Sequence, residues 1–396
     1  MIILQNRSKK IYYLNKVMRF ALYLFAIGLF TSKAATSTGL ILYLLLWIIK
    51  IVLTDNYKIN FTSLKKPIFL HLIIFILSAA FARNIFLLDD SSNKFLAIFF
   101  YWALVNEVKD LDFVKRIIKL SIFSAIVAVF YGLYQHYFIG INRVQSFSFS
   151  LGFGLHVSMI MAFTLIYLFW GNLNNKNKLM LFIANVLLFM NLIFTKARGA
   201  WLAFIGGVLL LVLIKKDKKL IISFIIVLLL LISFLPGEYI SRFESSFDLE
   251  GDRSIQHRLE LWEGAIEIFK DNPVIGIGYD NFRELYVEEY YPDRPYQDGR
   301  NAHNLYLHYL ANLGILGFLA LIYLFYSILK KIFLAYKQTN NYNLQLFFFS
   351  SFIAIVIFLL QGFTRVSYGR TDTVRFLWFL ISINIIFIEN LNIKEK

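Results

Sequence analysis

Arginine, lysine and histidine residues beside apolar segments are the side chains of this chain that could do chemistry. One long polar stretch, residues 237–304, interrupts an otherwise apolar sequence and holds about fifteen of the 25 Asp and Glu residues. Arg258 lies within it and His303 lies at its end, while Lys196 and Arg198 occupy a short turn upstream. Guanidinium groups bind phosphate through rigid bidentate contacts, and a neutral imidazole accepts protons near pH 7. Such a loop between apolar segments is typical of a chemical site carried on a membrane-embedded body.

The composition places the chain in the integral membrane class. Its 396 residues are 59% hydrophobic and 16% charged, with a mean hydropathy of +0.64, whereas soluble domains are about 45–50% apolar and about 25% charged. Cysteine is absent, which excludes disulfides, thiolate nucleophiles and Cys-ligated metals. The net charge of +15 sits in short loops between apolar runs, so membrane orientation explains it better than a nucleic-acid partner.

Apolar runs of roughly twenty residues recur along the chain, and each is long enough to cross a hydrocarbon core of about 30 Å. A spanning segment must satisfy its own backbone hydrogen bonds, so we expect helices. The predicted fold is all-α, with residues 1–396 forming one polytopic membrane domain of about twelve transmembrane helices. The predicted spans are 17–33, 39–54, 67–83, 93–108, 117–138, 147–170, 178–194, 199–214, 219–236, 304–329, 344–362 and 374–390.

Basic residues alternate between successive turns. Every second turn is rich in lysine, which indicates that these turns and both termini are cytoplasmic. Basic residues precede the first apolar run, which we expect to be retained as an anchor rather than cleaved. The large loop 237–303 then faces outward, as do the basic turns at 195–198 and 361–375. Since cations on the outer side oppose this orientation bias, they need another reason to be there.

Residues 254–269 of the loop predict an amphipathic helix. Ser254 can cap its start, and Asp271 with the Asn-Pro that follows can end it. At about 100° per residue, Arg258 falls at the edge of the apolar stripe, which we expect to be buried. The stripe consists of Ile255, Leu259, Trp262, Ile266 and Phe269.

Each candidate residue also has a purely structural interpretation. Lys196 and Arg198 could extend to lipid phosphates, Arg258 could form a surface ion pair with the surrounding acids, and His303 could pack or cap the tenth span. Arg365 lies in an outer basic cluster that could guide a lipid-linked anionic glycan or anchor headgroups; Arg370 and Arg375 are its other members. The Asp-x-Asp at 110–112 falls in a basic cytoplasmic turn, and we expect no metal site there or elsewhere.

Four ordered segments resemble the O-antigen ligase and polymerase superfamily. They are residues 196–203 (Lys-Ala-Arg-Gly-Ala-Trp-Leu-Ala), 257–262 (His-Arg-Leu-Glu-Leu-Trp), 272–278 (Asn-Pro-Val-Ile-Gly-Ile-Gly), and 303–307 with 313–317 (His-Asn-Leu-Tyr-Leu and Leu-Gly-Ile-Leu-Gly). One departure is Asn312, where many relatives carry an acidic residue before the Leu-Gly.

The resemblance implies a metal-independent, cofactor-free glycosyltransferase of the GT-C type in the bacterial plasma membrane. Such an enzyme transfers a glycan from undecaprenyl diphosphate to an acceptor hydroxyl outside the membrane. Arg198 and Arg258 would bind the diphosphate, with Lys196 and Arg365 as further substrate contacts, and His303 would act on the acceptor.

The alternative enzymes of this superfamily differ in the acceptor that they use. An O-antigen ligase uses the lipid A–core glycolipid, a polymerase joins repeat units from the same donor, and other ligases modify protein or cell-wall glycan. A flippase or exporter of lipid-linked glycans is a different class with a similar number of spans. Its cations should line a central cavity, whereas the cations here concentrate at one face, which favours an enzyme.

Overall fold

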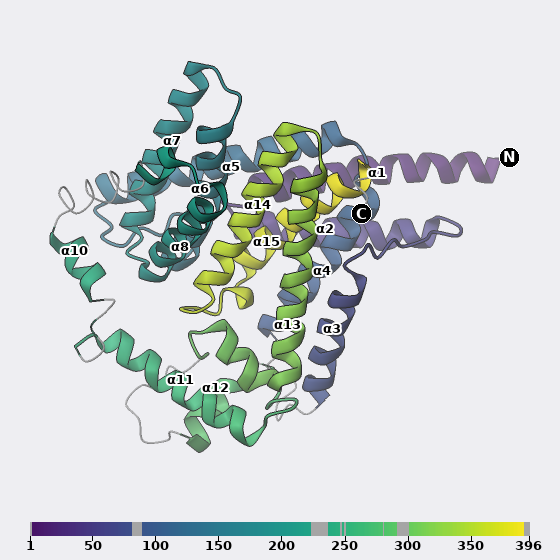
Figure 1. The fold of residues 1–396 in the computed structure, drawn as a ribbon. Coiled ribbons are helices and arrows are strands. Elements are labelled where there is room, and N and C mark those ends of the chain that lie inside the picture. The colour runs from purple at the N-terminus through teal and green to yellow at the C-terminus, as the bar shows by residue number, and fades with distance from the viewer. Residues whose placement is uncertain are drawn as a thin grey trace.

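The computed structural model describes residues 2–80, 89–222, 237–245, 248, 251–279, 281–290 and 301–391. These residues form helices joined by turns, and none of them belongs to a β-strand (Figure 1). The helices are α1 (Ile2–Gly28), α2 (Lys33–Leu53), α3 (Lys65–Ala80), α4 (Asp89–Glu107), α5 (Leu111–Tyr137), α6 (Ser150–Trp170), α7 (Asn175–Phe194), α8 (Arg198–Lys215), α10 (Gly237–Glu244), α11 (Arg253–Asp271), α12 (Phe282–Leu285), η2 (Tyr286–Tyr290), α13 (Leu305–Gln338), α14 (Tyr342–Gln361), η3 (Ser367–Gly369) and α15 (Thr371–Asn390).

Within the described residues, eight helices are long and apolar enough to cross a membrane: α2, α5, α6, α7, α8, α13, α14 and α15. Each coincides with a predicted span, which confirms an all-helical, polytopic chain. The predicted spans 17–33, 67–83 and 93–108 coincide with α1, α3 and α4, which are not among the eight. Most of the predicted span 219–236 lies outside the described residues. The count of about twelve therefore stays a prediction.

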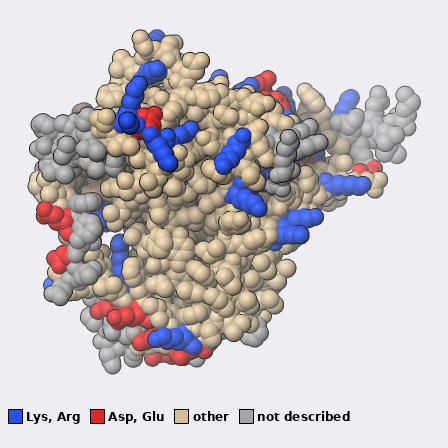
Figure 2. All heavy atoms as spheres, viewed as in Figure 1, with Lys and Arg blue, Asp and Glu red and all other residues tan. Residues whose placement is uncertain are grey.

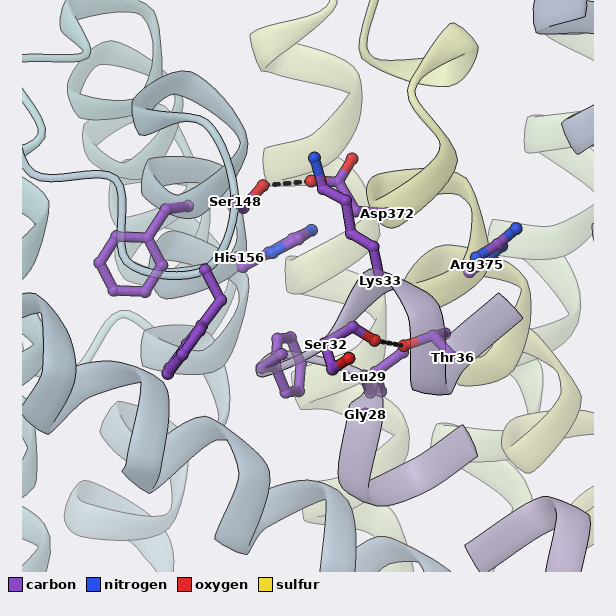
Figure 3. A pocket seen from close by; sticks show the side chains of 12 residues that line it. Gly28, Leu29, Ser32, Lys33, Thr36, Ser148, His156, Asp372 and Arg375 are labelled. Carbon is purple, nitrogen blue, oxygen red and sulfur yellow. Dashed lines mark hydrogen bonds between the residues drawn. The ribbon is translucent and has the colours of Figure 1, made fainter. Parts of the chain in front are cut away.

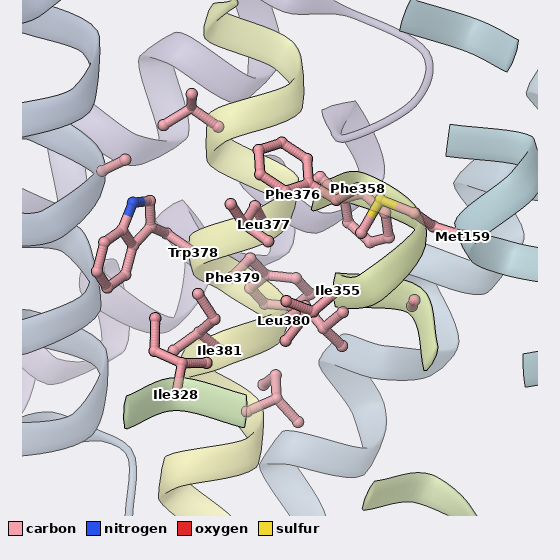
Figure 4. Close-up of a cluster of buried hydrophobic side chains, with 14 of the residues drawn as sticks. Met159, Ile328, Ile355, Phe358, Phe376, Leu377, Trp378, Phe379, Leu380 and Ile381 are labelled. Atoms are coloured by element: carbon pink, nitrogen blue, oxygen red, sulfur yellow. The ribbon is translucent and has the colours of Figure 1, made fainter. Parts of the chain in front are cut away.

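Helix α15 forms the centre of the bundle. Its side chains from Thr373 to Ile388 are all buried, and they contact residues of α6, α13 and α14 in the cluster that Figure 4 shows. Phe376, Trp378 and Ile381 point in different directions from the helix axis in that view. A helix that is apolar all round needs neighbours on every side, so the other helices are arranged around α15.

The turns gather at two ends of the bundle, as the predicted topology requires. At one end, Val144 N donates to Phe194 O (3.0 Å) and Leu305 N donates to Gly362 O (2.7 Å). Each of these hydrogen bonds joins two turns that are predicted to face outward. At the other end, the Tyr342 hydroxyl donates to the carbonyl of another inner turn, at Trp170 (2.5 Å). We call the first end the loop end, because it carries the large loop with α10, α11 and α12.

Much of the visible surface carries no charged side chains (Figure 2). In that view most of the visible lysines and arginines lie in the upper part, acidic residues lie at the left and lower edges and at a few places in the upper part, and a wide area carries no charge. Exposed side chains such as Val52, Phe182 and Leu213 lie on the apolar helices. Such a surface suits hydrocarbon, where lipid-facing side chains need no polar partners.

Loop helix α11 buries a different face from the predicted one. Leu259 and Ile266 of the predicted stripe are exposed, and the buried residues are Leu261, Gly264, Ala265 and Ile268. The reason is that α11 packs against α13 through the face that carries Leu261, Ala265 and Ile268. Its start also differs, since the N-cap is Asp252 rather than Ser254, whereas its end at Asp271 agrees with the prediction.

The loop end is expected to face the outside of the cell. Because the chain has no cysteine, single substitutions report their own accessibility. Lys270→Cys on α11 should react with a membrane-impermeant maleimide in intact cells, and Lys176→Cys at the start of α7 should react only after the inner face is opened. The reverse pattern would place the loop inside and contradict the proposed site.

Candidate active site at the loop end

The turn between α7 and α8 carries two buried cations that hold the loop. Lys196 has a left-handed backbone, with φ of 49°, and its side chain is buried. Its Nζ donates to Asn142 Oδ1 (2.5 Å) and to the carboxylate of Glu238 on α10. The hydrogen bond from Lys196 lowers the pKa of Glu238. Lys196 therefore ties the first loop helix to the bundle.

Arg198 is the first residue of α8, and only 6% of it is exposed. Its guanidinium binds Asp252 in a bidentate pair, with Nη1 2.6 Å from Oδ2 and Nη2 3.2 Å from Oδ1. Nη1 also donates to Ser245 Oγ (2.7 Å). The hydrogen bond from Arg198 lowers the pKa of Asp252 to about 2. Arg198 thus already holds a planar anion in the geometry that a phosphate would use.

Asp252 also fixes the direction of α11. As the N-cap of that helix it accepts hydrogen bonds from Ser254 N (2.9 Å) and Ile255 N (3.2 Å). A carboxylate at a helix N-terminus satisfies otherwise unpaired N–H groups. One side chain therefore links Arg198 to the start of the helix that carries Arg258.

His303 lies in the segment just before α13, outside any helix, and its ring faces α11. Its backbone has φ of 46°, and its N–H donates to Asn301 Oδ1 (3.0 Å). The residue that caps α13 is Asn304, which accepts from Tyr306 N at 2.9 Å. The imidazole is partly exposed, and its centroid lies 6.4 Å from that of His257 on α11.

Helix α11 brings the three predicted catalytic residues into one region. A rise of 1.5 Å per residue places His257 about 7.5 Å along the axis from Asp252. The ion pair of Arg198 and the ring of His303 therefore both lie beside the first two turns of α11, where partly buried Arg258 follows His257.

The next loop segment is hydrogen-bonded into a break in α13. At Gly314 the helix leaves helical geometry, with φ of 63° and ψ of −166°. The loop backbone takes over the hydrogen bonds that the helix loses there. The bonds join Ile277 N to Ala311 O (3.2 Å), Gly278 N to Asn312 O (3.0 Å), Ile315 N to Pro273 O (2.8 Å) and Leu316 N to Val274 O (3.3 Å). We call this pairing the latch.

Two glycines make the latch possible. A Cβ on Gly276 would lie 2.4 Å from the Asn312 carbonyl carbon, and a Cβ on Gly314 would lie 2.3 Å from Val274 O. Both residues also have positive φ, which glycine adopts at little cost. The glycines of residues 272–278 and 313–317 therefore allow two backbones to approach each other.

A buried lysine braces the segment that follows. Lys94 of α4 is buried, and its Nζ lies 3.4 Å from the ring centroid of Tyr279. A cation over an aromatic face at this distance is attracted to the ring, and the attraction is stronger away from water.

His308 is buried close to this pair. Its Nδ1 lies 3.1 Å from Nδ2 of Asn312, within hydrogen-bonding distance. The backbone carbonyl of Asn312 takes part in the latch, while its side chain contacts His308.

The turn from 362 to 370 bridges the two halves of the site. On one side, the carbonyl of Gly362 accepts a hydrogen bond from Leu305 N, close to His303. On the other side, Thr364 packs against Gly199, the neighbour of Arg198. A Cβ added to Gly199 would lie 2.1 Å from Thr364 Oγ1. Arg365 follows this contact and points toward the start of α6, with Nη1 3.9 Å from the Cβ position of Gly152.

The sequence alone missed several partners. Asp252, Glu238, Asn142 and His257 join the site through contacts with residues far away in the chain. The signal that could have found Asp252 is its position one residue before a helical segment, where Asp is a favoured cap. Within the described residues, no group of three His, Asp or Glu side chains is arranged to hold a metal ion.

Residues 183–322 match the family model of the O-antigen ligases, and no curated protein matches the chain. The matched range runs from α7 into α13 and includes Lys196, Arg198, Arg258 and His303. The match covers about a third of the chain and supports the resemblance of this part to the O-antigen ligase and polymerase superfamily. Together with the apolar helices, it points to a bacterial membrane protein with glycosyltransferase-type activity on lipid-linked glycans.

Proposed function

We propose that this protein acts as a member of the O-antigen ligase and polymerase superfamily and transfers a glycan from undecaprenyl diphosphate to an acceptor hydroxyl at the outer face of the plasma membrane. The acceptor that we propose is the lipid A–core glycolipid, as for an O-antigen ligase. The observation that carries the proposal is the convergence of Arg198, Arg258 and His303 on the first two turns of α11.

Arg198 and Arg258 are proposed to bind the donor diphosphate. Negative charge builds on this leaving group as the anomeric C–O bond breaks, and preorganised cations aimed at developing charge are often the largest catalytic contribution. The bidentate grip of Arg198 on Asp252 supports this role, because a carboxylate and a phosphate offer similar pairs of oxygens. In the reaction the diphosphate takes the place of Asp252 on the guanidinium. Lys196 provides further positive charge beside Arg198, and Arg365 is proposed to contact the substrate near the start of α6.

His303 is proposed to accept the proton of the acceptor hydroxyl as that oxygen attacks the anomeric carbon. The ring is partly exposed, and Asn304 rather than His303 caps α13, so capping of that helix does not require the imidazole. The latch supports this role too, since it fixes the loop against the helix that begins just after His303.

The decisive experiment is a transfer assay with purified protein, a polyprenyl-diphosphate-linked glycan and lipid A–core acceptor. Product should form at the same rate with and without EDTA, because arginines rather than a metal neutralise the diphosphate. Complete loss of activity in EDTA, restored by magnesium, would overturn the role of the arginines. Elongation of the donor glycan without acceptor would instead identify a polymerase.

A further inference from the structure

Three long helices begin at the loop end without a side-chain cap. Their N-cap residues are Phe149 for α6, Ala197 for α8 and Arg370 for α15, and none accepts a backbone hydrogen bond through its side chain. By contrast, Asp110 and Asn174 cap α5 and α7 at the other end of the bundle. The first N–H groups of a helix have no intrahelical acceptor and carry partial positive charge.

The three helix starts converge. The Cβ position of Gly154 on α6 lies 3.2 Å from the Cβ of Ala197, at the start of α8. The Cβ position of Gly152, on the first turn of α6, lies 3.2 Å from Oδ2 of Asp372, at the start of α15. The start of α6 therefore lies between those of α8 and α15.

Arg365 adds a full positive charge to this place without an ion-pair partner among the described residues. Its side chain is partly buried, and Nη1 is buried with no hydrogen-bond partner among the described residues. The nearby carboxylate of Asp372 offsets part of this charge, but it forms no ion pair with Arg365 and accepts hydrogen bonds from the Ser148 hydroxyl and from Thr373 N (3.0 Å). Burying an unpaired cation is costly, so this arrangement calls for an anion next to Arg365 and Gly152.

Further cations surround the same place. Lys33 and Arg370 lie on the ring of Phe149, with Nζ 4.7 Å and Cζ 4.5 Å from its centroid. Arg143 is close enough to affect Arg365 electrostatically. Among the described residues, Asp372 is the carboxylate that acts on Arg365, so positive charge is in excess there.

The cavity beside Asp372 is too small to be the anion site itself. Figure 3 shows Ser148, His156 and Lys33 around Asp372, and the cavity volume of about 20 Å³ suits a single water molecule. A larger anion would reach the start of α6 from the outer surface, where Lys33 is exposed.

We propose that the first turn of α6, together with Arg365, is a phosphate-binding site separate from the Arg198 and Arg258 pair. Backbone N–H groups at a helix start and a guanidinium fork are complementary to phosphate oxygens. The phosphate belongs either to a substrate or to an anionic lipid headgroup of the outer leaflet. This inference rests on the proposed function in one respect: the proposed function also gives Arg365 a contact with substrate.

The test is titration of inorganic phosphate by calorimetry into purified full-length protein in detergent. The Arg198→Ala background impairs the proposed donor site and isolates the new one. Adding Arg365→Gln should weaken phosphate binding at least tenfold, and adding Gly152→Ala should also weaken it, because the new methyl group would crowd the first turn of α6. Adding Arg116→Gln, at an exposed site on the other end of the bundle, should change nothing.

Equal phosphate affinity with and without Arg365→Gln, or no binding by the folded Arg198→Ala protein, would overturn the site. If Arg365→Gln does not fold, Gly152→Ala decides. Nanodiscs distinguish the two sources: phosphatidylglycerol should compete with phosphate if the ligand is a headgroup, and should not if it is a substrate. Phosphate binding needs no transfer activity, so this site and the proposed function can fail separately.

Discussion

Replacing His303 with asparagine is expected to lower the rate of glycan transfer by about 10²–10⁴-fold, the usual contribution of a general base. Asparagine is the informative substitution because it tolerates the left-handed backbone that His303 adopts, with φ of 46°. The variant should therefore fold and bind donor normally while lacking the imidazole. Transfer rates and donor affinity, measured on the same preparation, separate the two effects.

The matched control is His136→Gln. His136 also lies near the loop end, but it stacks on Phe194, with ring centroids 3.7 Å apart, and has no proposed catalytic role. Its replacement should leave transfer near the wild-type rate. If His303→Asn protein were equally active, His303 would be a structural residue and the arginines would be the remaining catalytic groups.

Arg198→Ala is expected to lower donor turnover roughly a hundredfold, which corresponds to about 3 kcal/mol of lost transition-state stabilisation. Arg198→Lys should recover only part of this, because an ammonium lacks the bidentate fork. Single-turnover rates at saturating donor measure the loss directly.

Asp252→Asn separates catalysis from loop anchoring. Asparagine still caps α11 but no longer forms an ion pair with Arg198. If Arg198 binds the diphosphate, the Asp252→Asn protein should keep most of its activity. A loss as large as that of Arg198→Ala would mean that the pair serves only to hold the loop.

The spans and the region of the site could be predicted because they depend on local properties of the sequence. Eight predicted spans coincide with apolar helices, and the positions of Arg198 and His303 beside the loop follow from chain order alone. The end of α11 at Asp271 also follows from local signals, since Asn-Pro cannot continue a helix.

The buried face of α11 could not be predicted, because both of its faces carry apolar residues. The pattern favoured the stripe with Leu259 and Ile266, whereas α13 covers the face with Leu261 and Ala265. Only the neighbouring helix decides between two such faces. The cation partners could not be predicted for the same reason. The sequence can suggest Asp252 as a helix cap, but it does not show that Arg198, far away in the chain, binds it.

The latch also has a consequence for biogenesis. During synthesis, residues 273–278 emerge before the segment of α13 whose broken backbone they complete. Until that segment is inserted, the loop backbone lacks its hydrogen-bond partners, and the segment around Gly314 cannot satisfy its own carbonyls and N–H groups within the membrane. The loop can therefore reach its final structure only after insertion of the helix that follows it, so assembly of the candidate site depends on membrane integration of α13.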